Sequence, residues 1–238
     1  MTGYRSTAEE ITSLLQLESP PVALTFVNEA PAGIAKTADV SPATCGFWRL
    51  AENGVFYADA AQHFNCQVGA MVMGFDLPSQ VMEEIGGLVD AMCGCSYLSP
   101  DEGDKIPSVG GGHAGVLYGP LAEFPEPPSA VVLWLSAKQA MIFNEAAGAS
   151  SWAAAAPPRV SGRPACAALP LAVQGERPAL SFGCMGMRTF TEVADDRMLA
   201  VVPGEQLPAF VEALRSTVDA NESMLSYYTK RKAEVAGS

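Results

Sequence analysis

The chain has 238 residues, of which 49% are hydrophobic, and a formal net charge of -12. This length fits one large globular domain or two small ones around a substantial core. The acidic balance argues against nucleic-acid binding, because neutralising phosphates needs clustered Lys and Arg, and only 14 such residues are spread along the chain. No apolar run of about 18 residues and no export signal is recognisable, so we expect a soluble, cytoplasmic protein that does not bind membranes.

The first half of the chain alternates helical and strand signals. Thr7 and Glu10 have the spacing of a capping box, and Pro20-Pro21 ends the helix that they open. A β-branched and aromatic run follows and indicates a buried strand. The expected elements are a helix over 7–18, a strand over 22–27, a helix from a cap at 41 to about 52, a strand over 55–60 and a helix over 78–92.

The second half repeats this alternation after a Gly- and Pro-rich loop. Its expected elements are strands over 114–118, 131–135, 180–182 and 197–202, a helix over 137–147, a loop over 149–162 and a long amphipathic helix from 206. The pattern predicts an α/β (α+β) fold, with a mixed sheet and flanking helices. We expect one domain over residues 1–238.

Cysteines follow helix-start signals in both halves. Ser41-Pro42 is a cap followed by proline, which places Cys45 in the first turn of a helix. Asn65 is a plausible cap before Cys66, and Pro164 precedes Cys166. The positive end of a helix favours thiolate over thiol, so we expect these sulfurs to act as nucleophiles or metal ligands.

Two cysteine segments resemble each other. Aligned at their first cysteine, 45–54 and 166–175 share Leu, Ala and Gly at equal offsets. In each copy a second cysteine, Cys66 or Cys184, begins a short segment rich in Gly and Met. This internal repeat suggests two pseudo-symmetric half-units that bring four cysteines to one seam. Accidental matching of an alanine-rich sequence stays the alternative. The half-units would cover about 19–112 and 129–204, followed by a C-terminal helix over about 205–233.

Nearly the whole chain resembles the DUF169 family, a prokaryotic group whose name records an unassigned function. The resemblance is carried by the opening at Ser19–Ala23, by Cys66-Gln-Val-Gly69, by Cys184-Met-Gly-Met-Arg188-Thr-Phe190, and by 194–198 running into Pro203. It implies a shared site formed by cysteines at positions known from the family, and it supplies no substrate. Cys93 and Cys95 do not match those positions. The matching positions are Cys45, Cys66, Cys166 and Cys184.

Four thiolates at one seam would repel each other unless a cation neutralises them or they stay protonated. Zinc sites usually show paired C-x-x-C knuckles, which the isolated cysteines lack. An iron–sulfur cluster accepts widely separated ligands, so we expect [4Fe–4S] at these four cysteines. Methionines nearby, which equally suit core packing, keep Cu(I) as an alternative, and Zn stays open too. These methionines are Met71, Met73, Met185 and Met187.

Arg188 and His63 are the candidate catalytic residues. Arg188 could donate to a sulfide or hold an anionic substrate, and the alternative is an ion pair with Asp195 or Asp196. His63 could serve as an acid, a base or an extra ligand, and the alternative is a histidine of an exposed turn.

These observations predict a cysteine-ligated metal-centre protein in redox or sulfur chemistry on a small molecule. Whether it is an enzyme is open; an iron–sulfur oxidoreductase and a sulfur-transfer enzyme both fit. The alternative is a thiol-based soft-metal or redox-sensing module without catalysis, in which Cys93 and Cys95 would capture the metal. A small-molecule substrate or an electron-transfer protein is the expected partner, and a homo-oligomer is open.

Overall fold

The computed structural model describes residues 3–149 and 159–236. Its centre is a mixed sheet with the strand order β2-β3-β1-β4-β7-β6-β5. The β5–β6 pair is parallel and all other pairs are antiparallel. The strands are β1 (Val22–Val27), β2 (Phe56–Asp59), β3 (Gly115–Pro120), β4 (Ala130–Leu135), β5 (Arg159–Ser161), β6 (Ala179–Ser181) and β7 (Met198–Pro203).

Both faces of the sheet are covered. Along β4, Val132 and Trp134 point into one apolar core while Val131, Leu133 and Leu135 point into another. This alternation is the two-residue period of a strand, and it explains why the central strands read as continuous apolar runs. The sheet therefore separates two cores that differ in the helices that close them.

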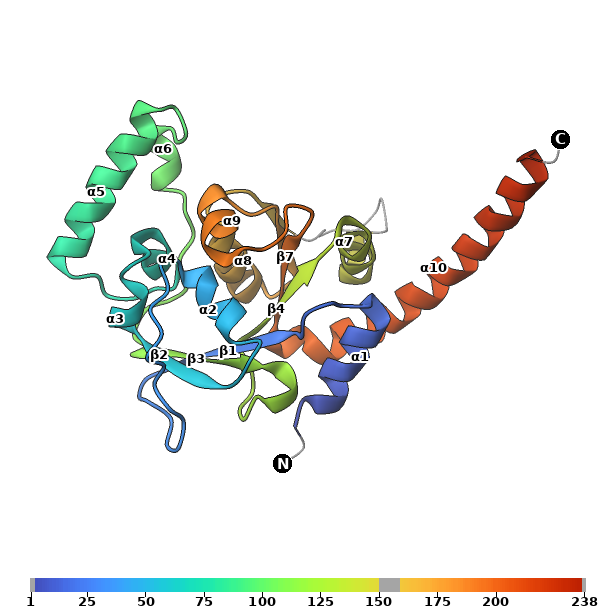
Figure 1. Ribbon diagram of the computed structural model, residues 1–238, viewed down its shortest axis with the longest axis horizontal. Helices are drawn as coiled ribbons and strands as arrows, with labels where there is room; N and C mark the ends of the chain where they lie inside the picture. Colours follow the sequence, from blue (N-terminus) through green and yellow to red (C-terminus); the bar gives the residue numbers. More distant parts are fainter. Residues whose placement is uncertain (1–2, 150–158, 237–238) are drawn as a thin grey trace.

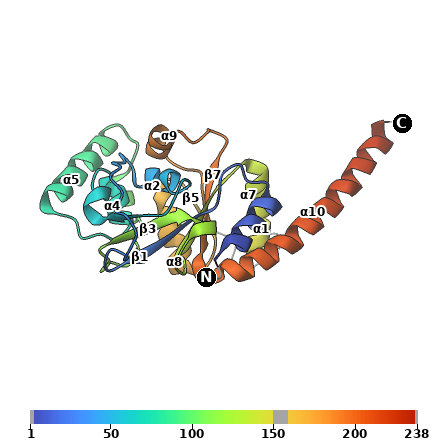
Figure 2. The same ribbon diagram turned by 60° about the horizontal axis from the view of Figure 1, so that its bottom comes forward.

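One face carries the cysteine-bearing helices and the other carries the terminal helices. The first layer holds α2 (Thr44–Leu50), α4 (Gln67–Val72), α8 (Ala168–Gly175) and α9 (Met185–Thr191). The opposite layer holds α1 (Arg5–Leu15), α7 (Ala137–Asn144) and the start of α10 (Leu207–Ala236). Figures 1 and 2 show the two layers on either side of the strands.

Two segments extend away from this body, at opposite ends of the molecule (Figure 1). The first contains α5 (Ser79–Gly94) and the short α6 (Pro100–Gly103), and Val81 is the only buried residue of α5. The second is the C-terminal half of α10. No helix within residues 3–149 and 159–236 combines the length and the apolar character needed to cross a membrane.

The sequence predicts the mixed α/β architecture correctly, and it misplaces several elements. The first helix begins at Arg5, so Thr7 lies inside it and forms no capping box. Helix α9 was not expected, and β5 occupies the end of the expected loop over 149–162, of which 150–158 lie outside the described residues. Both elements are short, and short elements leave little periodicity in a sequence.

The strand order bears on the half-unit hypothesis, which stays a prediction. From the centre outward the sheet reads β1-β3-β2 on one side and β4-β7-β6 on the other. At the centre, Val22 pairs with Val132 and Ala23 with Val131. Two half-units related by a two-fold axis between β1 and β4 would give this order and this reciprocal pairing. By its pairing, β3 goes with the first half, although it follows the expected boundary at 112.

Candidate cysteine site

The elements that carry Cys45, Cys66, Cys166 and Cys184, hereafter the four-cysteine site, meet over the centre of one sheet face. Helix α2 contains Cys45 and contacts α4, α9 and the 3-10 turn η3 (Ala165–Ala167), which contains Cys166. Cys66 and Cys184 are the N-caps of α4 and α9. All four side chains belong to the same apolar core. Segments from both halves of the chain therefore build one site.

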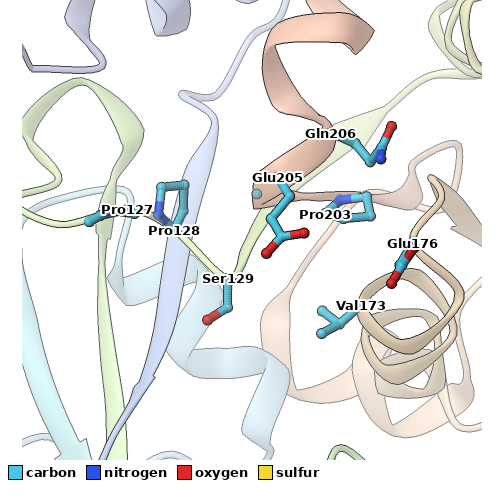
Figure 3. Close-up of a pocket in the computed structure, with 9 residues that line it drawn as sticks. Pro127, Pro128, Ser129, Val173, Glu176, Pro203, Glu205 and Gln206 are labelled. Atoms are coloured by element: carbon cyan, nitrogen blue, oxygen red, sulfur yellow. The ribbon is translucent and has the colours of Figure 1, made fainter.

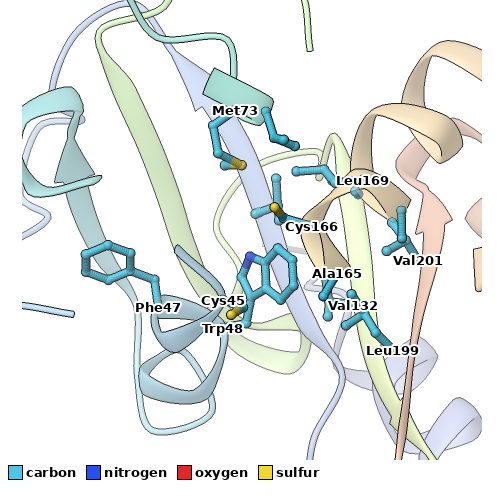
Figure 4. Packing of buried hydrophobic residues seen from close by; sticks show 14 of the residues in the cluster. Cys45, Phe47, Trp48, Met73, Val132, Ala165, Cys166, Leu169, Leu199 and Val201 are labelled. Carbon is cyan, nitrogen blue, oxygen red and sulfur yellow. The ribbon is translucent and has the colours of Figure 1, made fainter. Parts of the chain in front are cut away.

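Cys45 and Cys166 are the deep members of the site, exposed by only 6% and 7%. Figure 4 shows both sulfurs beside Trp48, above the strands that carry Val132 and Leu199. Burial raises the pKa of the Cys45 thiol far above its ordinary value, and the nearby Cys66 and Cys184 raise it further. For Cys166, burial again dominates, followed by Cys66, Cys45 and Cys184. The sulfurs are close enough to oppose each other's ionisation.

The expected helix-dipole effect at Cys45 is present and is outweighed. Cys45 is the second residue of α2, as predicted, and the amides of Cys45 and Gly46 lower its pKa. Loss of hydration in the apolar core has the larger effect, so the thiol of the metal-free protein stays protonated. The position of Cys45 at a helix start is confirmed, the alternative of a protonated thiol fits the metal-free protein, and the role of Cys45 as a ligand stays a prediction. A bound cation would have to displace that proton.

Cys66 and Cys184 are the shallow members of the site and lie half-buried at helix starts. The amide of Met187 donates a hydrogen bond to the Cys184 Sγ at 3.4 Å, so this sulfur caps α9. Gly183, immediately before it, has a φ of 90°, a conformation that glycine adopts without a steric penalty. At Cys66 the cap is the cysteine itself, one residue after the Asn65 that the sequence suggested.

Gly69 keeps a space open beside the Cys66 sulfur. A methyl group on Gly69 would lie 2.7 Å from the Cys66 Sγ and would also collide with the Thr44 Oγ1. Thr44 is fully buried, and its hydroxyl has no hydrogen-bond partner in the described structure. A buried hydroxyl without a partner costs free energy, which a sulfur-rich group at this site could recover by accepting its hydrogen bond.

Within the described residues, no three His, Cys, Asp or Glu side chains form a group able to hold one metal ion. The four thiols of the metal-free protein therefore do not form a ready single-ion site. A metal centre at these cysteines stays a prediction.

Cys93 and Cys95 lie outside this site. Both belong to the end of α5, where Cys93 is half-buried and Cys95 is exposed. The Cys95 thiol donates a weak hydrogen bond to the Met92 carbonyl at 3.4 Å. Neither sulfur contributes to the raised pKa of Cys45 or Cys166.

His63 is buried to 1% exposure, so the alternative of an exposed turn histidine is wrong. Its Nδ1–H donates to the Asp59 carbonyl at 2.7 Å, and its Nε2 accepts from the Tyr118 hydroxyl at 2.9 Å. Burial lowers its pKa to about 4, so the ring is neutral at pH 7. Both ring nitrogens are occupied, which leaves none for a metal or a substrate in this conformation. A catalytic or ligand role for His63 is not tested by these contacts and stays a prediction.

Arg188 lies close to the site but holds the backbone. Its guanidinium donates to the carbonyls of Ala194, Phe182 and Arg197 at 2.8–2.9 Å. These three bonds tie α9 to the strands on either side of it. Arg188 forms no ion pair within the described residues. Asp196 pairs with Arg197 instead, at 3.5 Å. The contacts give Arg188 a positioning role, and the substrate role stays a prediction.

The four methionines divide between core and surface. Met73 and Met187 are fully buried in the same core as the cysteines. Met185 is exposed and Met71 is half-buried. This distribution fits flexible packing of an irregular core.

Two hollows are prominent on the described surface, and only one reaches the site. A pocket of about 510 Å³ is lined by Cys184, Arg163, Arg188 and Tyr97, with the exposed Phe182 and Met185 at its rim. The Arg163 guanidinium lies over the Tyr97 ring at 4.5 Å, which ties the loop after α5 to this pocket. The other hollow, of about 410 Å³, lies at the ends of β4 and β7 and contains no cysteine (Figure 3).

Sequence reasoning missed three residues that shape the site: Thr44, Gly69 and Tyr118. Burial by the core raises the pKa of the Tyr118 hydroxyl well above its ordinary value, and Cys166 and Cys45 raise it further. This hydroxyl is therefore close to the two deep thiols. Gly69 follows Cys66 within a motif that already stood out in the sequence. Thr44 and Tyr118 gave no such signal, because only tertiary packing brings them to the cysteines.

One known protein family matches most of the chain. The DUF169 family profile, described as uncharacterised ArCR, matches residues 10–213 and thereby covers all four cysteines and the entire sheet. No curated protein and no solved structure matches the chain. The chain belongs to the DUF169 family.

Proposed function

We propose that this protein binds a [4Fe–4S] cluster through Cys45, Cys66, Cys166 and Cys184 and uses it in redox or sulfur chemistry on a small molecule. The observation that carries the proposal is the convergence of four cysteines, from four separate segments, on one apolar core in which the pKa values of the two buried thiols are raised. A cation-rich centre is the simplest group that would compensate for ionising them there.

The choice of a cluster over a single ion rests on the sequence pattern of the ligands. The four cysteines are isolated along the chain and lack the paired C-x-x-C knuckles that are usual in zinc sites. Fe–S clusters are held by four Cys thiolates and present several metal atoms to them. A cluster would supply one-electron transfer or a sulfide, and the chain would supply the ligands and the apolar enclosure.

The residues around the thiols would tune and protect that centre. Trp48 and Tyr118 close its buried side, and the Thr44 hydroxyl is available to donate a hydrogen bond to a sulfur. Such donors stabilise the more negative state of a thiolate-bound centre. Gly69 keeps the neighbouring space free of a side chain.

A substrate or an electron-transfer partner would approach from the Cys184 side. Cys184 is half-buried and lines the pocket of about 510 Å³, whereas Cys45 and Cys166 are buried within the core. Arg163 at the pocket wall offers a cation, and Phe182 offers an apolar surface. This combination suits a small molecule with an anionic group and an apolar body. With six free thiols in the described structure, we place this chemistry in the reducing cytoplasm.

The test is anaerobic purification followed by iron and acid-labile sulfide analysis. We expect about four irons and four sulfides per chain, together with brown colour. Cys93→Ser with Cys95→Ser is the matched control, because these thiols lie outside the site, and we expect full retention of iron. A colourless protein without iron after anaerobic reconstitution contradicts the proposal.

A second candidate is thiol-based sensing of a soft metal or an oxidant. The observation that favours it is the position of Cys93 and Cys95 on the outlying α5, where a metal such as Cu(I) or Zn could reach them. Changing both to Ser would then abolish metal-dependent changes in partner binding. An unchanged response would exclude this segment as the sensing element.

A further inference from the structure

The C-terminal half of α10 leaves the body with an apolar stripe exposed. Helix α10 has 30 residues, which corresponds to about 45 Å. Its buried residues end at Leu214, and every residue from 222 to 236 is exposed. Figures 1 and 2 both show this half projecting from the molecule. Leu225 and Tyr228 are exposed by 60% and 61%, respectively.

The exposed stripe continues the seam by which α10 packs on its own sheet. Positions spaced alternately three and four residues apart, the heptad spacing of a coiled coil, are apolar along the helix except at Asn221 and Lys232. The heptad positions are Val211, Leu214, Val218, Asn221, Leu225, Tyr228, Lys232 and Val235. The first two lie in the core, and Asn221 Nδ2 still reaches Glu145 of the body at 2.6 Å. Beyond Asn221 the same seam runs on without the body beneath it.

Charge along this half is separated. Its base carries Asp219 and Glu222, with Glu145 of the body beside Asn221. Its tip carries Lys230, Arg231 and Lys232 and stays net positive although Glu234 pairs with Arg231 at 3.3 Å. Two such helices in parallel would align like charges and like helix dipoles. In antiparallel orientation, the basic tip of one helix lies against the acidic base of the other. Leu225 of each helix then lies across from Tyr228 of the other.

We infer that this protein forms a homodimer through antiparallel pairing of the projecting halves of α10, with Leu225 and Tyr228 at the centre of the seam. With Leu225 across from Tyr228, the two projecting halves overlap over residues 222–231, a segment about 15 Å long. So short a seam buries less area than a standard interface, so the dimer should dissociate on dilution. The family match ends at residue 213, before this segment, so the dimer is a property of this chain outside the matched region.

Sedimentation velocity over a range of protein concentrations tests the inference. We expect a concentration-dependent monomer–dimer equilibrium for the wild type and a monomer for Leu225→Glu at every concentration. Ser226→Glu adds the same charge next to this position and away from the seam, and it should dimerise like the wild type. Circular dichroism should show equal helix content in the two variants. A monomeric wild type, or a dimer that Leu225→Glu leaves intact, overturns the inference.

Orientation is tested by carbodiimide coupling, which joins a carboxylate directly to an amine. Glu222 and Lys232 are about 15 Å apart along one helix, so a bond between them within one chain is out of reach. In the antiparallel pair they meet across the seam. We expect the Glu222–Lys232 link in the dimer band, and its loss in Glu222→Gln. A dimer without this link overturns the antiparallel orientation. Iron content plays no part in either readout, so failure here leaves the proposed cluster untouched.

Discussion

The two deep cysteines and the two shallow cysteines lie in environments that differ in their exposure to solvent. Cys45 and Cys166 are buried within the core, where burial raises the pKa of each thiol. Cys66 and Cys184 lie half-buried at helix starts. Each half of the chain supplies one of each kind. Under the proposed function, a metal centre would displace the protons of the deep pair, and the shallow pair would lie between that centre and solvent. The comparison suggests a site that is anchored from within and reached from the Cys184 side.

The largest effect should come from removing single proposed ligands. These variants test whether the two halves of the chain contribute equally to the site. Cys66→Ser and Cys184→Ser should each lose most of the bound iron, although they lie in different halves. Equal loss follows if neither half can complete four ligands alone. Iron analysis after identical reconstitution decides it. Loss in Cys184→Ser with full retention in Cys66→Ser would restrict the site to the second half.

The sequence singled out these four cysteines, which the fold brings to one core, but it did not predict their surroundings; their role as ligands stays a prediction. Helix-start signals and self-similarity singled out the cysteines, and the strand runs at 22–27 and 131–135 gave the centre of the sheet. The burial of the site's side chains could not be predicted from the sequence, because it depends on which distant segments of the chain cover the site. The protonation of Cys45, the occupied nitrogens of His63 and the carbonyl bonds of Arg188 all follow from such covering.

A methyl group beside Cys66 should have the next largest effect, and it acts on Cys66 and its neighbour Thr44. Gly69→Ala places carbon 2.7 Å from the Cys66 Sγ and against Thr44, so the sulfur must shift. We expect reduced iron loading and a cost in stability of about 1–3 kcal/mol. Gly86→Ala on α5 is the control, because its added carbon meets nothing within 4 Å. It should keep full iron and gain up to about 1 kcal/mol. Equal iron content in the two variants would refute the account of Gly69.

Alkaline pH should separate the deep pair from the shallow pair in the metal-free protein. The folded pKa of Cys45 and Cys166 is raised, so both stay protonated when the unfolded chain begins to ionise near pH 9. Unfolding then releases protons, and stability present below pH 9 is lost as pH rises. The loss should approach about 1.4 kcal/mol per thiol and pH unit. Urea unfolding between pH 8 and pH 10.5 measures it.

The control for this pH effect is a variant with Cys45→Ala and Cys166→Ala. Its stability should fall less steeply over the same range, because the two deep thiols are gone. Wild-type and variant slopes that coincide would show that the deep thiols ionise as easily as exposed ones.

The smallest effect should come from the Tyr118–His63 pair behind the deep cysteines. Tyr118→Phe removes the hydroxyl that donates to His63 Nε2 at 2.9 Å. A buried acceptor is left without a partner, at a cost of about 1–3 kcal/mol. Iron loading should be unchanged, because neither residue is one of the four proposed cysteine ligands. Thermal unfolding and iron analysis of one preparation measure both. Loss of iron without loss of stability would instead assign Tyr118 to the metal centre.

Iron Mössbauer spectroscopy of anaerobically reconstituted protein tests the central claim most directly, because it reports how many irons share one centre and what binds them. The account predicts the spectrum of a tetranuclear cluster with sulfur ligands on every iron, and its loss when Cys166 is changed to Ser. A spectrum of isolated iron bound by four thiolates, or no retained iron, would contradict it.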